Sequence, residues 1–119
     1  MSFSVDDARS HMLAMPKVTE ETPFGPEVLV YKVLGKMFAT LVFEDEVGRM
    51  NLKCDADRAL ELRDDHEAII PGYHMNKKHW NTLVLDGSLS SVLVEELMAH
   101  SYDLVVKGMT KKLREELGK

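Results

Sequence analysis

The sequence has little of what extracellular or membrane proteins need. Its 119 residues include one cysteine, Cys54, which excludes an intrachain disulfide and fits a reducing compartment. No apolar run approaches the roughly 18 residues that a membrane-spanning helix requires. Residues 1–7 contain no basic stretch followed by an apolar one, so we expect no secretory signal. Together these absences predict a soluble, cytoplasmic protein.

The chain also lacks an excess of positive charge. It carries 20 acidic and 15 basic side chains, which gives a net charge of −5. DNA-binding domains are usually basic, so this balance counts against binding to nucleic acid. It does not decide the matter, because charges are screened over about 8 Å at physiological salt and a local basic surface can act on its own.

Signatures of catalysis are absent as well. The sequence contains no Gly-x-Ser-x-Gly motif, no phosphate-binding P-loop and no dinucleotide-binding glycine pattern. Cys54 lies on the apolar side of an expected strand, and the negative charge of Asp55 should raise its pKa, so the thiol is expected to be inert. We therefore expect no catalytic residues and a protein that is not an enzyme.

The five histidines do not form a recognisable metal site. His74 and His79 are five residues apart, which places them on opposite faces of a continuous strand. The other histidines lie in separate segments, without a cysteine pair or a His-Glu-x-x-His helix. We expect no bound metal and no cofactor.

The first part of the chain predicts one helix followed by three strands. Ser4 is a typical helix-capping residue, and apolar side chains at helical spacing follow it as far as Pro16. β-Branched and aromatic residues then predict strands over residues 28–34, 37–43 and 49–54. We expect a type II′ turn at Gly35-Lys36 between the first two strands.

The second part adds a helix, a strand and two further helices. Asp55 is expected to cap a short helix, and residues 80–85 are expected to form a strand. Ser90 or Ser91 should begin the next helix, and Ser101 a last one that extends to Leu117. The order α-β-β-β-α-β-α-α, with strands joined by tight turns, predicts an α+β fold in which helices pack on one face of an antiparallel sheet. No repeat or linker is apparent, so residues 1–119 should form one domain.

The most distinctive stretch covers residues 73–82. Two lysines, two histidines, two asparagines and two large aromatic residues occur there, in the order Tyr73-His74-Met75-Asn76-Lys77-Lys78-His79-Trp80-Asn81-Thr82. Lysines bind phosphate, aromatic rings stack and amides form hydrogen bonds, so the stretch suits an anionic, planar partner. The alternative is a solvated loop whose lysines protect a strand edge.

The strand that ends this stretch has two distinguishable faces. Trp80 shares one face with Thr82 and Val84, whereas His79 and Asn81 share the other. Trp80 is expected to be in the core or half-buried, because a single tryptophan in a small domain is usually a core anchor. The face with His79 and Asn81 is then the better binding candidate.

Several segments together resemble the MmcQ/YjbR-like family of small bacterial proteins. The most specific is Pro71-Gly72 followed by residues 73–82, and the others are Phe24-Gly25, residues 33–39, Leu85-Asp86-Gly87 and residues 101–106. The resemblance implies a CyaY-like fold and, as proposed for the family, DNA binding through loops that project from the sheet like paired wings. Here the wing candidates are the loop around residues 72–79 and a hairpin tip, either at Gly35-Lys36 or at residues 44–48. The tip at residues 44–48 is acidic and would repel DNA.

On this basis we expect weak, largely sequence-independent DNA binding. Lys77 and Lys78 would contact phosphates, with His74, Asn76, His79 and Asn81 near the backbone or the base edges. The last helix would extend the basic surface if it lies alongside, through Lys107, Lys111, Lys112 and Arg114.

Two other functions compete with DNA binding. A small-molecule-binding or sequestering protein would have a cleft lined by Tyr31, Tyr73, His79 and Trp80 and would show an enclosed, largely apolar pocket. A protein-interaction module would use the acidic surface and would show an exposed apolar patch of several hundred Å².

Overall fold

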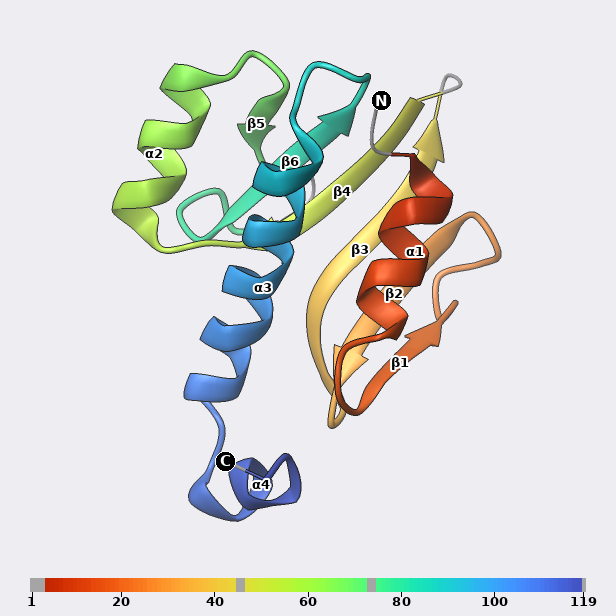
Figure 1. Ribbon diagram of the computed structural model, residues 1–119, viewed down its shortest axis with the longest axis vertical. Coiled ribbons are helices and arrows are strands. Elements are labelled where there is room, and N and C mark those ends of the chain that lie inside the picture. The colour runs from red at the N-terminus through yellow and green to blue at the C-terminus, as the bar shows by residue number, and fades with distance from the viewer. Residues whose placement is uncertain (1–3, 45–46, 73–74, 119) are drawn as a thin grey trace.

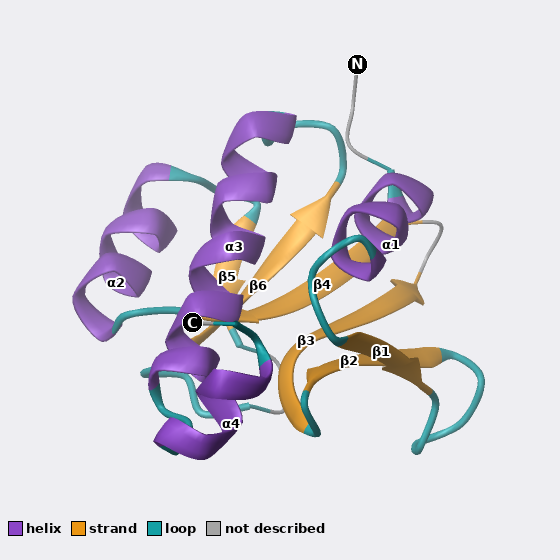
Figure 2. Cartoon of the chain, turned by 60° about the horizontal axis from the view of Figure 1, so that its bottom comes forward, coloured by secondary structure: helices purple, strands orange, loops and turns teal. Residues whose placement is uncertain are grey.

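The computed structural model describes residues 4–44, 47–72 and 75–118. Six antiparallel strands form one sheet in the order β1-β2-β3-β4-β6-β5, and α1, α2 and α3 all lie on one face of it (Figures 1 and 2). The elements are α1 Val5–Leu13, β1 Val18–Glu21, β2 Val28–Val33, β3 Lys36–Glu44, β4 Val47–Lys53, α2 Ala56–Asp65, β5 Ile69–Pro71, β6 Trp80–Leu85, α3 Ser91–Lys107 and α4 Lys111–Glu116. The predicted α+β fold, with helices on one face of an antiparallel sheet, is confirmed. None of the helices described is long and apolar enough to cross a membrane.

The helix starts are set by local capping, as the sequence predicts. The Ser4 hydroxyl accepts a hydrogen bond from the Asp7 N–H, and the Asp7 carboxylate accepts one from the Ser4 N–H, which completes a capping box. Asp55 caps α2 through the Arg58 N–H, and Ser90 caps α3 through the Leu93 N–H. These bonds satisfy amide groups that have no partner within their helices.

The turn between β2 and β3 differs from the prediction. Its two connecting residues are Leu34 and Gly35, with φ of 49° and 81°, and Val33 pairs with Lys36. Two left-handed residues define a type I′ turn, not the type II′ turn expected at Gly35-Lys36. The pairing is shifted by one residue because a β-bulge near Tyr31 and Lys32 places both Phe38 and Ala39 in the core.

Ser101 does not begin a helix. It lies inside α3, which runs unbroken to Lys107, and its side chain is fully buried against the sheet. Its hydroxyl donates to the Phe38 carbonyl oxygen (2.5 Å) and accepts from the Lys53 N–H (2.9 Å). The chain breaks later, at Gly108, and Thr110 caps the short helix α4.

Two short edge strands were not predicted. β1 and β5 have four and three residues, and they flank the sheet on opposite sides. Strands of this length carry too little alternation to be recognised, and Pro71 in β5 looked like a chain break.

Strand alternation divides the sheet into a helix face and an open face. The helix face carries most of the core and includes Tyr31, Leu41, Met50, Leu52 and Leu83. We define the open face by side chains that pair across neighbouring strands on the opposite side: Lys32, Thr40, Arg49, Asn51, Lys53, Trp80 and Thr82. Thr40 and Thr82 are nevertheless buried, with 6% and 2% of their surface exposed.

A charged network connects α1 with β1 and β2 at one side of the helix face. Arg9 donates two hydrogen bonds to the Glu20 carboxylate, from Nε to Oε2 (3.0 Å) and from Nη2 to Oε1 (2.9 Å). The buried Tyr31 hydroxyl donates to Oε2 of Glu20 at 2.5 Å. The hydrogen bond from Arg9 holds the pKa of Glu20 below its usual range, whereas burial raises the pKa of Tyr31.

This network predicts a specific loss of stability in acid. A carboxyl group whose pKa is lower in the folded state contributes stability that is fully present above its unfolded pKa and is lost as the pH falls through its folded pKa. Glu20→Gln should lower the free energy of unfolding by about 1–2 kcal/mol at pH 7. Urea denaturation at pH 7 and at pH 2.5 should show this difference shrinking in acid. An equal difference at both pH values would contradict the charged role of Glu20.

Candidate nucleic-acid interface

The lysines of the distinctive stretch lie on a loop closed by backbone hydrogen bonds. At its neck the Gly72 N–H donates to the Trp80 carbonyl oxygen (2.9 Å). Residues 76–79 form a turn in which the His79 N–H donates to the Asn76 carbonyl oxygen (3.2 Å). The Asn76 side-chain oxygen accepts from the Lys78 N–H (2.9 Å), so this amide shapes the turn that presents the lysines.

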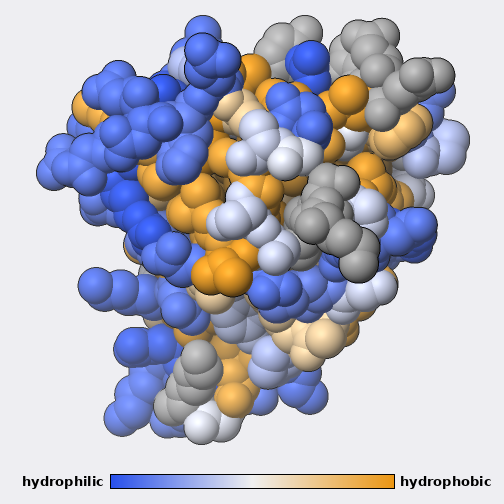
Figure 3. All heavy atoms as spheres, turned by 45° about the horizontal axis from the view of Figure 1, so that its top comes forward, coloured by the Kyte–Doolittle hydropathy of each residue, from blue (hydrophilic) through white to orange (hydrophobic). Residues whose placement is uncertain are grey.

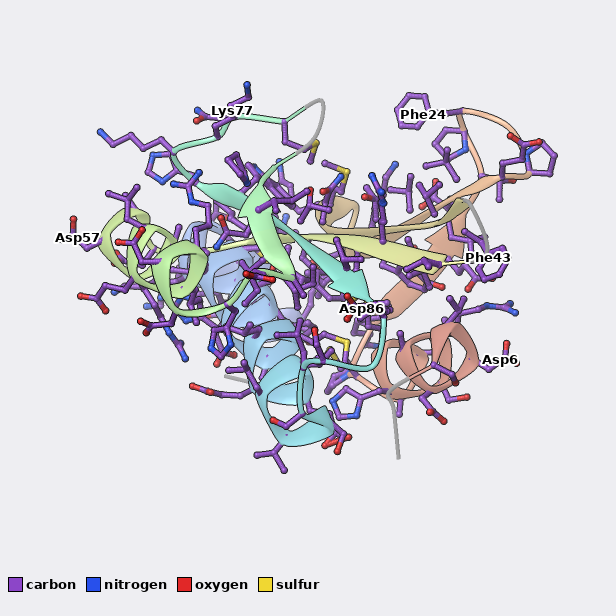
Figure 4. The ribbon with its side chains drawn as sticks, turned by 90° about the horizontal axis from the view of Figure 1, so that it is seen from above. Asp6, Phe24, Phe43, Asp57, Lys77 and Asp86 are labelled. Atoms are coloured by element: carbon purple, nitrogen blue, oxygen red, sulfur yellow. The ribbon has the colours of Figure 1, made fainter. Side chains whose placement is uncertain are left out.

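Lys77 and Lys78 occupy the tip of this turn. Both are exposed, and neither forms an ion pair with a carboxylate of the described residues. Figure 4 shows that Lys77 projects on the side of the sheet away from the helices. Phe24, in the loop between β1 and β2, projects on the same side and is 75% exposed. Two loops therefore rise from the open face, one basic and one with an aromatic tip.

Asn81 does not belong to this surface, contrary to the prediction. It is 1% exposed on the helix face, where its Nδ2 donates to the Ala59 carbonyl oxygen of α2 (3.3 Å). Its Oδ1 is buried and has no partner within the described part of the chain. Trp80 lies on the opposite face and is half-buried, which agrees with the half-buried state expected for it. Both faces of β6 end in aliphatic residues, so the pattern distinguished two faces but not which one the helices cover.

Of the remaining residues in the binding prediction, the structure describes His79 but not His74. His79 is half-buried, and its carbonyl oxygen accepts from the Cys54 N–H (2.7 Å), which fixes the end of the loop to β4. His74 and Tyr73 lie outside the described residues.

Tyr31 and Trp80 were both assigned to a possible ligand cleft, but they lie on opposite faces of the sheet and cannot line the same cleft.

The cysteine is buried, as its position on the apolar side of a strand predicted. Burial is the main cause of a raised pKa at Cys54. The negative charge of Asp55 also raises this pKa, whereas the positive charge of Arg58 opposes the shift. The thiol is therefore protonated near neutral pH.

The open face carries further positive charge on its central strands. Arg49 and Lys53 lie on the same face of β4, four residues apart, and Lys32 lies on β2. Lys32 is paired with Glu21 at 3.3 Å, whereas Arg49 and Lys53 form no ion pair within the described part of the chain. The sequence predicted Arg49 only as part of the strand over residues 49–54, because its neighbours across the sheet depend on register.

The lysines near the C-terminus form a separate, mixed-charge surface. Lys107, Lys111 and Arg114 line a surface hollow together with the carboxylates of Asp103 and Glu115. α4 lies at one end of the long axis of the molecule (Figure 1). These residues are therefore not a simple extension of the basic loop.

A protein-interaction module would show a large exposed apolar patch, and the acidic helices lie on one side of the sheet. Figure 3 shows hydrophobic surface on this side bordered by hydrophilic side chains. The exposed large hydrophobic residues each come from a different element or loop: Leu13, Phe24, Phe43, Leu60 and Val92.

The chain is similar to known proteins over most of its length. The YjbR family model matches residues 13–104, which include the whole sheet and most of the helical layer. The chain belongs to the YjbR family. It is 37% identical to the uncharacterised protein YbdF of Escherichia coli O157:H7 over 107 residues, covering 90% of this chain and 88% of YbdF.

Further proteins are similar to this chain in sequence or in structure. The uncharacterised protein YjbR of Escherichia coli K12 is 26% identical over 115 residues, covering 97% of this chain and 98% of that protein. The crystal structure of a Deinococcus radiodurans protein with a DUF419 domain has a TM-score of 0.88 and 46% identity, covering 98% of this chain and 89% of that one. A Pseudomonas syringae protein, 23% identical, shares the fold with a TM-score of 0.77, covering 86% of this chain and 98% of that one.

Proposed function

We propose that this YjbR-family protein binds DNA without catalysing a reaction. The observation that carries the proposal is the exposed pair Lys77 and Lys78 on a turn that projects from the open face, with no ion pair from either lysine to a carboxylate of the described residues. Lysine acts as a mobile point charge, so these residues suit contacts to backbone phosphates more than readings of particular bases.

The net charge of −5 counts less against DNA binding because the acidic side chains of the helices lie away from the basic loop. The helices α1, α2 and α3 carry more carboxylates than cations, with Asp6, Asp7, Asp57, Glu61, Asp64, Asp65, Glu95, Glu96 and Asp103 against Arg9, Arg58, Arg63 and Lys107. These helices and the basic loop lie on opposite sides of the sheet (Figure 4). The molecule measures 27 Å along its shortest axis. Screening over about 8 Å therefore weakens repulsion between the outer acids and a polyanion at the open face.

The local contacts support the proposal that binding has little sequence preference. The Asn76 side-chain oxygen is already engaged by the Lys78 N–H, and Asn81 is buried on the other face. Specific readers of base edges, such as a bidentate arginine or asparagine, are thus lacking at the tip of the described turn. Phosphate contacts dominate the proposed mode.

The test is a salt series with labelled duplex DNA, followed by fluorescence anisotropy. Each phosphate neutralised contributes about 0.9 to the slope of log affinity against log salt, so Lys77→Ala/Lys78→Ala should reduce that slope by about 2. Both side chains are exposed, so the fold should remain intact. No binding by the wild type at low salt would contradict the proposal.

The chain offers a matched control for this experiment. Lys111→Ala/Lys112→Ala removes the same charge from exposed positions at the first turn of α4. It should leave the slope nearly unchanged. Equal reductions in both double variants would show that overall charge, not the basic loop, governs the binding.

A further inference from the structure

Arg49 occupies the middle of the open face. It pairs with Val42 of β3 on one side and with Val84 of β6 on the other, and Val28 of β2 continues the same row. All three valines are half-buried. Arg49 is therefore a charged residue in an otherwise apolar row of side chains. Its strand, β4, lies between the strands joined by the loop of Phe24 and those joined by the loop of Lys77.

The Nε atom of Arg49 is fully buried and has no hydrogen-bond partner among the residues that the structure describes. Arg49 also forms no ion pair with a carboxylate of the residues described. By contrast, the arginine and lysine side chains that form ion pairs within the described residues are Arg9, Lys32 and Arg58, and each has a glutamate partner. Arg49 thus differs from them by being partly removed from water without a counter-charge.

A buried donor without an acceptor is costly, and an unpaired charge that has lost part of its hydration is more so. The guanidinium group presents N–H donors in a planar fork that matches the oxygens of a phosphate or carboxylate. We propose that Arg49 binds a phosphate group on the open face. The inference does not rest on DNA binding, because the phosphate can belong to a small phosphate monoester or to a nucleic-acid backbone.

The surroundings of Arg49 favour such a site. The neighbouring row on the open face is polar and includes Thr40, Asn51 and Thr82, with the Thr82 hydroxyl donating to the Asn51 side-chain oxygen. An anion at Arg49 would lie beside this polar row on one side and valine side chains on the other. Valines exclude water, which strengthens a charge-assisted hydrogen bond.

The direct test observes the Nε–H signal of Arg49 by two-dimensional ¹H–¹⁵N NMR. The signal is assigned by its loss in Arg49→Met. The probes are inorganic phosphate, thymidine monophosphate and a 12-base-pair duplex, each at constant ionic strength with sodium chloride as the reference. We expect a saturable shift of this signal in the wild type. Backbone amide signals of β4 follow binding in the variants, and the affinity of Arg49→Met should be at least tenfold weaker because charge-assisted hydrogen bonds are lost.

Two variants separate binding from folding and from general charge. Methionine is apolar and similar in length, so Arg49→Met should have a thermal midpoint at least as high as the wild type. Lys53→Met removes one charge from the same strand and the same face, and it should keep the response to phosphate. Arg49→Lys keeps the charge but loses the fork, so its affinity should also fall.

The outcomes distinguish this inference from the proposed function. A shift with phosphate or the monophosphate identifies a small-ligand site, even if Lys77→Ala/Lys78→Ala has no effect on DNA. A shift with the duplex alone identifies the backbone as the source of the phosphate. The inference is overturned if no probe shifts the signal beyond sodium chloride, or if Arg49→Met binds as well as the wild type, because the guanidinium group would then not contact the anion.

Discussion

Replacing Ser101 by alanine is expected to lower the free energy of unfolding by about 3 kcal/mol, because one hydroxyl satisfies two backbone groups. Its oxygen donates to the Phe38 carbonyl and accepts from the Lys53 N–H, and its side chain is fully buried. Alanine leaves both groups without this partner, at the place where the bulge interrupts the regular ladder of β3. Urea denaturation measures the loss as a lower midpoint with an unchanged m-value.

A second serine on the same helix supplies the control. Ser91 is the first residue of α3 and is exposed, so Ser91→Ala should change stability by no more than about 0.5 kcal/mol. Ser101→Thr retains the hydroxyl but adds a methyl group to a filled space. If Ser101→Ala matched Ser91→Ala, the two hydrogen bonds would not hold α3 against the sheet.

Gly72→Ala is expected to destabilise the fold by about 2–4 kcal/mol and to disturb the basic loop with it. A Cβ atom at Gly72 would lie 2.7 Å from the Trp80 Cβ and 2.8 Å from the Trp80 carbonyl oxygen. The second contact is with backbone, so side-chain rotation cannot relieve it. The neck must open, which breaks the Gly72 N–H bond to Trp80.

This change links stability to the proposed function, and both can be measured on one sample. Urea denaturation should report the lower stability, and anisotropy should report weaker DNA binding under conditions where the variant is still folded. Gly108→Ala is the matched control: its Cβ would meet only ordinary contacts, at 3.6 Å from the Val105 carbonyl oxygen, and its φ of −80° suits alanine. If Gly72→Ala were as stable as the wild type, the backbone at Gly72 would not lie this close to Trp80.

The elements that local chemistry determines were the ones predicted well. Ser4, Asp55 and Ser90 each cap a helix because a short polar side chain can satisfy amide groups within three residues of itself. The strand Trp80–Leu85 was predicted with its observed bounds, since its composition and flanking turns are local features too. These predictions needed no knowledge of the rest of the fold.

Predictions that depend on distant contacts fared worse. Ser101 has the same chemistry as a capping serine, but its hydroxyl is used by two strands that are far away in the sequence. Asn81 looked like a surface residue because only the packing of α2 shows which face of β6 is covered. Arg49 became noticeable only once its neighbours across the sheet were known. Periodicity gives two faces, and tertiary structure chooses between them.

The two short strands at the margins of the sheet have a consequence for self-association. A free strand edge is a template on which another chain can add its own strand and begin a fibre. Here β5 offers three residues and ends in Pro71, which has no amide hydrogen, and β1 offers four residues that include Glu20 and Glu21. The long strands β3 and β4 are enclosed between neighbours. Both margins are thus poor templates for strand addition, and contacts with other molecules are left to side chains.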